Sequence, residues 1–171
     1  FITCDYYYYN GKKINILDKV EKILEQIPSI KKVIAFNYNK QERESLKNFI
    51  NFEETLKNDL DEVFERFEFN HPIYILFSSG TTGKPKCITH GSGNVLIEHN
   101  KEFMLHCDIR ENEKIFYYTT TGWMMWNWLV GGLATGSSIF LFDGSPFYPK
   151  IDVLLEYCQN KKINLFGVSA K

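Results

Sequence analysis

The chain has 171 residues, of which 44% are hydrophobic and 24% charged, and this ordinary globular composition argues against disorder. Its net charge of −1 gives no field that would favour nucleic acid or an anionic membrane surface. Four widely spaced cysteines, with no C-x-x-C pair among them, indicate reduced thiols in a cytoplasmic protein rather than a disulfide framework or a zinc site.

The N-terminal residues predict a strand, a helix and a second strand, followed by a charged segment. Asn10-Gly11 follows a β-rich run and is a strong hairpin signal. Residues 16–27 carry apolar side chains at helical spacing, and residues 33–38 form a short apolar run. Residues 39–72 are highly charged, with aromatic residues at loosely helical spacing, so we expect a helical connecting segment on the surface.

The remaining residues alternate short apolar strands with helices. We expect strands at 74–77, 87–89, 115–118, 138–142 and 164–166, and helices at 91–104, 122–134 and 151–158. This alternation predicts an α/β fold with a mixed, largely parallel sheet and helices on both of its faces. The longest apolar run, Trp123 to Ala134, is too short to span a bilayer, so we interpret it as a core helix and expect no membrane insertion.

The most informative motif is a loop of hydroxyl residues and glycines between an apolar strand, expected to be buried, and Pro85-Lys86. Glycines let the backbone approach a ligand closely and hydroxyls add donors, so the loop can line an anion site beside a lysine. It lies at the carboxyl end of a strand, where ligands bind in open α/β sheets. We therefore predict a site for a nucleotide polyphosphate, with candidate residues Ser78, Ser79, Gly80, Thr81, Thr82, Gly83 and Lys86.

Two better-known phosphate motifs do not fit this loop. Pro85 stands where a Walker A loop requires its second glycine, and Leu96 stands where a dinucleotide fingerprint requires its third. The role of Lys86 stays open, because a lysine at this exit could contact phosphate or only anchor the loop through a nearby acid.

A second motif, Thr-Thr-Thr-Gly-Trp-Met-Met-Trp-Asn-Trp, covers residues 119–128. Aromatic residues and methionines fill irregular core space well, which is one interpretation of the run. Asn127 is a lone amide among apolar side chains, where an unpaired polar group would cost about 1–3 kcal/mol. Its partner could be a backbone carbonyl, or a carboxylate or keto oxygen of a small substrate.

From Ile75 to Lys86 the loop resembles the phosphate-loop signature of the adenylate-forming enzymes, which include acyl-CoA synthetases, luciferases and peptide-synthetase adenylation domains. Within this superfamily nearly the whole chain is similar to the acetoacetyl-CoA synthetases, and the Gly122–Trp128 string is the discriminating segment. Further resemblance lies at Cys4–Tyr6, Tyr9–Lys12, His71–Tyr74, His90–Gly91, Leu105–Asp108 and Leu141–Pro146.

The resemblance implies a two-step ligase that uses ATP, Mg²⁺ and CoA. ATP and acetoacetate form an acyl-adenylate and pyrophosphate, and CoA then releases acetoacetyl-CoA and AMP. The glycine-rich loop would bind the phosphates, and the acyl pocket would be formed by Trp123, Met124, Met125 and Asn127. Replacing Trp123 with glycine should then shift preference toward longer acids.

The resemblance also implies a domain position. Residues 1–171 would form part of the large N-terminal AMP-binding (adenylation) domain, and the small C-terminal domain with its catalytic lysine would lie outside the chain. The segments for adenine, ribose and the metal-associated acid would lie outside it as well. The missing initiator methionine and the abrupt end at Ala170-Lys171 agree with an internal piece, which we expect to be inactive alone.

Two alternatives remain open. An acetyl- or propionyl-CoA synthetase would share the loop and differ only in its acid. A truncated, non-catalytic nucleotide-binding fragment would keep the loop without the chemistry. We predict no metal site in the chain, because His99, His106 and Cys107 lack a suitably spaced third ligand.

Overall fold

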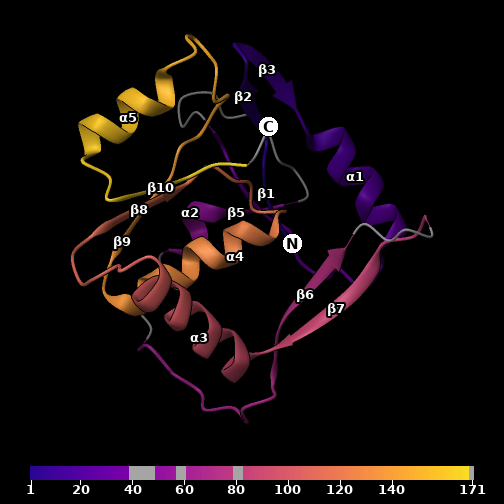
Figure 1. Cartoon of the computed structure of the whole chain (residues 1–171). Helices are drawn as coiled ribbons and strands as arrows, with labels where there is room; N and C mark the ends of the chain where they lie inside the picture. Colours follow the sequence, from indigo (N-terminus) through magenta and orange to yellow (C-terminus); the bar gives the residue numbers. More distant parts are fainter. Residues whose placement is uncertain (39–48, 57–60, 79–82, 170–171) are drawn as a thin grey trace. The chain divides into compact units, whose positions relative to one another are not determined.

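The computed structural model describes residues 1–38, 49–56, 61–78 and 83–169, and the chain divides into two compact units (Figure 1). The first unit consists of Phe1–Val63 and Phe147–Lys150, and the second of Phe64–Pro146 and Ile151–Lys171.

The first unit contains a small parallel sheet and a hairpin. Strands β1 (Ile2–Cys4), β4 (Ile34–Phe36) and β5 (Ile50–Asn51) pair in the order β1-β4-β5, and helix α1 (Leu17–Gln26) precedes β4. Strands β2 (Tyr6–Tyr9) and β3 (Lys12–Asn15) pair antiparallel across Asn10 and Gly11, whose φ angles are 51° and 74°. A two-residue turn of type I′ requires positive φ at both positions, so the hairpin prediction is confirmed.

The charged segment at 39–72 departs from the predicted helical structure. Among its described residues the only helix is α2 (Phe52–Thr55), and residues 61–69 contain neither helix nor strand. Val63 and Phe64 are 80% and 85% exposed. Their side chains therefore gain no packing that would stabilise a helix. Residues 39–48 and 57–60 lie outside the described residues.

The second unit is built on a three-stranded parallel sheet. Strands β8 (Lys114–Tyr117), β9 (Ser138–Phe140) and β10 (Leu165–Gly167) pair in the order β10-β8-β9. Adjacent residues Ile115 and Phe116 point to opposite faces, yet both are fully buried. The central strand is therefore covered on both sides, as parallel strands usually are.

Helices cover the two faces of this sheet. On one face Ile115 packs with Phe103 and Leu129, which come from the π-helical segment η1 (Glu102–His106) and from α4 (Met124–Gly131). On the other face the ring of Phe116 lies 5.4 Å from that of Tyr157, in α5 (Val153–Lys161). Helix α3 (Ser92–Lys101) leads directly into η1, and the 3-10 turn η2 (Gly132–Thr135) follows α4.

Strands β6 (Pro72–Ser78) and β7 (Lys86–Gly91) form a separate antiparallel pair in the second unit. The strand predicted at 74–77 is present, but it is not buried as expected, because Ile75 and Phe77 are 61% and 69% exposed. Alternate side chains of a strand point to opposite faces, and in this unit only one face of the pair is packed.

The predicted α/β class is confirmed. The strands are, however, distributed over two three-stranded parallel sheets and two antiparallel pairs, rather than joined in one mixed sheet. None of the helices in the described part of the chain is long and apolar enough to cross a membrane.

Candidate functional site

The two ends of the predicted phosphate loop lie directly opposite each other. Ser78 ends β6, Lys86 begins β7, and the two residues are paired across the strands. The loop therefore closes an antiparallel hairpin, whereas we expected it to follow a strand of an open parallel sheet. Its central residues, Ser79, Gly80, Thr81 and Thr82, lie outside the described residues.

Gly83 has a backbone conformation that explains why glycine stands there. Its φ is 92°, a backbone angle that residues with a Cβ rarely adopt. This backbone angle favours glycine at the position.

A pocket of about 710 Å³ lies in the second unit, beside the β6–β7 hairpin and between α3 and α4. The strands contribute Tyr74, Leu76, His90 and, from β8, Tyr117. The α3–η1 helix contributes Asn94, Val95, Ile97, Glu98, His99 and Glu102. Helix α4 contributes Met124, Met125, Asn127 and Trp128.

Three of the four predicted acyl-pocket residues line this pocket. Met124, Met125 and Asn127 lie in the first turn and a half of α4, and their side chains border the cavity. Trp123 is the N-cap residue of α4, does not line the pocket and is 60% exposed. The structure thus brings Met124, Met125 and Asn127 together and leaves Trp123 outside the group.

Close packing of α3 against α4 forms the inner wall of the pocket. The imidazole of His99 occupies the position that a Cβ on Gly131 would take. The same ring meets Phe103 edge to face, with 6.4 Å between the centroids. Only a glycine at position 131 lets the two helices approach this closely, which places His99 at the wall of the pocket.

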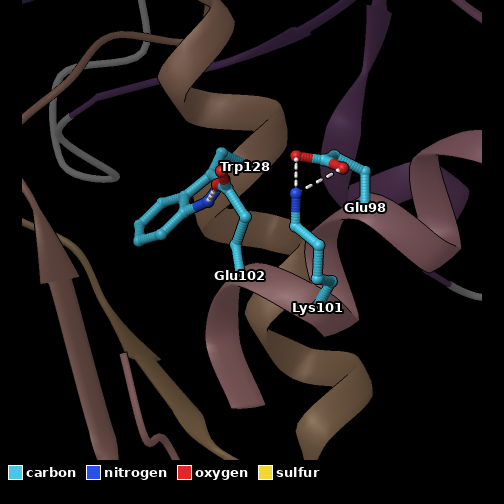
Figure 2. Close-up of polar contacts among 4 residues, drawn as sticks. All are labelled: Glu98, Lys101, Glu102 and Trp128. Carbon is cyan, nitrogen blue, oxygen red and sulfur yellow. Dashed lines mark hydrogen bonds and ion pairs between the residues drawn. The ribbon is translucent and has the colours of Figure 1, made fainter. Parts of the chain in front are cut away.

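A hydrogen bond ties the two helices together at the next turn (Figure 2). The indole Nε1 of Trp128 donates to Oε2 of Glu102 at 2.8 Å. The ring of Trp128 also lies 4.3 Å from Phe103 and 5.9 Å from Tyr117, measured between centroids. Glu102 begins the π-helical segment, and such segments are common at functional sites.

The acidic residues of the pocket differ in how their charge is balanced. Lys101 donates to both carboxylate oxygens of Glu98, at 2.8 and 2.9 Å, and this hydrogen bond is the main reason that the pKa of Glu98 is lowered (Figure 2). The carboxylate of Glu102 accepts a hydrogen bond from the neutral indole of Trp128, and it also interacts with Lys101 and Glu98.

Two other polar groups of the pocket stay neutral near pH 7. Burial lowers the pKa of His99, and this effect outweighs the opposing influence of Glu102 and Glu98. Burial also raises the pKa of Tyr74, so its phenol stays protonated. In the described part of the chain, no group of three or more His, Cys, Asp or Glu residues could hold a metal ion.

Sequence reasoning missed Glu98, Glu102, Tyr74 and His90 as lining residues. The i,i+4 spacing of Glu98 and Glu102 places both on one helix face, which was a usable local signal. Nothing local, however, indicates that this face turns toward α4. Tyr74 and His90 are paired across the hairpin, and their register became known only with the structure.

The chain is similar to one protein family and to several named proteins. The family model described as AMP-binding enzyme matches residues 2–170. The acetoacetyl-coenzyme A synthetase of Rhizobium meliloti (strain 1021) is 43% identical over 177 residues, which cover 100% of this chain and 27% of that protein. The malonamoyl-CoA synthetase of Penicillium aethiopicum is 38% identical over 152 residues, or 82% of this chain and 21% of that protein.

A solved structure also resembles the chain. The acetoacetyl-CoA synthetase from Streptomyces lividans superimposes with a TM-score of 0.91 at 39% sequence identity, covering 98% of this chain and 26% of that one. The chain thus spans about a quarter of the length of these acetoacetyl-CoA synthetases.

Proposed function

Because the chain belongs to the family of AMP-binding enzymes, we propose that the protein containing it is an AMP-forming acetoacetate–CoA ligase. The observation that carries the proposal is the similarity to acetoacetyl-CoA synthetases along the full length of the chain. Residues 1–171 then form part of the large N-terminal adenylation domain.

The first step joins the acid to AMP. A carboxylate oxygen of acetoacetate attacks the α-phosphorus of ATP, a new P–O bond forms, and the bond to the bridging oxygen breaks to release pyrophosphate. Negative charge grows on the departing phosphates, and donors held in place beforehand stabilise it. We assign this role to Ser78, Ser79, Gly80, Thr81, Thr82 and Gly83, with Lys86 at the loop exit. Mg²⁺ carried by the phosphates supplies further charge neutralisation.

The pocket suits the acyl part of the acid. Tyr74, Leu76 and Ser78 lie on one face of β6, so the hairpin wall of the pocket continues to the loop. A carboxylate placed at the loop would direct its tail toward Met124, Met125 and Asn127. The amide of Asn127, a half-buried side chain of the pocket lining, can donate a hydrogen bond to a keto oxygen.

The names of the relatives support one substrate class. The acetoacetyl and malonamoyl groups both carry an uncharged carbonyl at the third carbon, followed by a methyl group in one and an amino group in the other. A pocket with apolar side chains and neutral donors is suited to both. We therefore expect monocarboxylic acids with a neutral 3-carbonyl tail.

The second step forms the thioester. The sulfur of CoA attacks the acyl carbonyl carbon, the C–S bond forms, the C–O bond to AMP breaks, and the thiol proton is released. The pocket residues of this chain hold the acyl group during this step, and we assign the catalytic lysine to the rest of the protein.

None of the four cysteines forms a disulfide, which supports a cytoplasmic location.

The test is ATP–pyrophosphate exchange by the full-length protein. With acetoacetate and Mg²⁺, and without CoA, exchange should occur and should stop when EDTA removes the metal. When Mg²⁺ is present, addition of CoA should yield AMP and acetoacetyl-CoA in equal amounts. Exchange driven better by acetate or propionate would identify a different acyl-CoA synthetase. Nucleotide binding without exchange for any acid would indicate a non-catalytic protein.

A further inference from the structure

The β6–β7 hairpin, which contributes one wall of the pocket, has two ends of different charge. Ser78 and Lys86, the residues that flank the phosphate loop, lie at its tip. Helix α3 begins directly after Gly91, at the opposite end of β7, so the α3–η1 wall is far along the hairpin from the loop (Figure 1). An acid whose carboxylate faces the loop therefore points its tail toward Glu98 and Glu102.

Glu98 and Glu102 lie beside one cation, Lys101, so these three side chains together remain negatively charged. The Nζ of Lys101 lies 2.8 Å from the carboxylate of Glu98, and Lys101 also interacts electrostatically with Glu102. The carboxylate of Glu102 accepts a hydrogen bond from the indole of Trp128, which orients it and adds no charge. Glu102 is thus a negative charge held in one place beside Trp128 and Tyr117.

We propose that Glu102 determines the substrate class, because its fixed carboxylate at the tail end of the pocket excludes acids whose tail carries a second negative charge. This inference rests on the proposed function and narrows it. Dicarboxylates are rejected by repulsion, while acids with a neutral carbonyl tail of the same size are accepted. Two like charges a few ångströms apart in a partly buried site repel strongly enough to change selectivity by about tenfold to a hundredfold.

The sharpest test compares malonamate with malonate, since the two acids match in size and differ in the charge of the tail. Wild-type, full-length protein should catalyse ATP–pyrophosphate exchange at least about a hundred times better with malonamate, judged by kcat/KM. Glu102→Gln keeps an acceptor for the indole N–H and removes the charge. It should reduce this ratio by about tenfold, through a rise in kcat/KM for malonate.

Two further variants separate charge from packing. Glu111→Gln makes the same chemical change at an exposed residue outside the pocket and should leave the ratio unchanged. Glu102→Leu removes the acceptor of the Trp128 hydrogen bond as well as the charge, and it should lower exchange with malonamate and acetoacetate together.

If the wild-type protein is active and Glu102→Gln leaves the malonamate-to-malonate ratio unchanged, Glu102 does not exclude dicarboxylates. Its role is then only to position Trp128. Equal use of malonate and malonamate by the wild type would overturn the inference without any variant, which keeps the test decisive even if Glu102→Gln does not fold. Failure of the wild type to exchange with any acid would overturn the proposed function, and the inference with it.

Discussion

At the residue scale, side chains at the start of α4 line the pocket that we propose binds the acyl group. Met124 and Met125 border the cavity, whereas Trp123 is largely exposed and lies outside its lining. Met124 is 52% exposed and Met125 is half-buried, so we expect removal of the Met125 side chain to lengthen the space available to the tail.

Met125→Ala should shift preference toward longer acids. Each methylene that gains a buried position contributes about 0.8 kcal/mol, so we expect the ratio of kcat/KM for hexanoate to that for acetoacetate to rise about fivefold or more. Trp123→Gly should shift the ratio in the same direction but less. Loss of activity on every acid alike, with no gain on longer ones, would reduce the mutated residue to a packing role.

At the element scale, the α3–α4 contact holds the pocket together. Gly131 accommodates the imidazole of His99, and Glu102 accepts the indole hydrogen bond one turn further along. The two contacts join residues that are 32 (131 − 99) and 26 positions apart in sequence, so both depend on a short approach between the helices. Substitutions that separate the helices should therefore disturb both stability and the pocket.

Gly131→Ala tests the close approach. Its Cβ would collide with the His99 ring, and overpacking of this kind typically costs about 1–3 kcal/mol. Gly122→Ala is the matched control, because nothing lies within 4 Å of the position of its Cβ, and it should change stability by less than about 0.5 kcal/mol. Urea unfolding of both variants gives the comparison, and equal effects would show that the contact has no energetic importance.

The half-buried imidazole of His99 should make this contact sensitive to acid. Its pKa is lowered by burial, partly opposed by Glu102 and Glu98 and assisted by His90. The unfolded chain then binds the proton more tightly than the folded one. The stabilisation is complete above about pH 6.5, the ordinary value for histidine, and is lost progressively as the pH falls below it.

His99→Gln removes the titrating group and should flatten this dependence. Thermal unfolding midpoints between pH 7.5 and 5.5 would be compared for the variant and the wild type, with the difference expected only below about pH 6.5. If the wild-type midpoint falls no more than that of the variant over this range, His99 binds its proton equally tightly in the folded and the unfolded chain.

Local patterns predicted most elements of the fold, because helical and strand periods are recorded in neighbouring residues. Asn10-Gly11 specified its turn in this way, through the positive φ that both residues tolerate. The exposed face of β6 was not foreseen, because an apolar run does not reveal how many strands will pair with it. The role of Glu102 was missed for a related reason: it depends on which face of α3 meets α4.

At the scale of the whole molecule, the second compact unit carries both the ends of the predicted phosphate loop and the pocket. Both border the β6–β7 hairpin, so an acid and a nucleotide bound there would meet along one surface. We propose that this arrangement serves small acids with neutral carbonyl tails.

The most direct measurement is pyrophosphate release by the full-length protein with ATP, Mg²⁺ and CoA, across acetoacetate, acetate, propionate, butyrate and hexanoate. We predict the highest kcat/KM for acetoacetate, because only this acid offers a keto oxygen to Asn127. A higher value for acetate, propionate, butyrate or hexanoate would contradict the assignment of the pocket, even if the adenylation chemistry itself were retained.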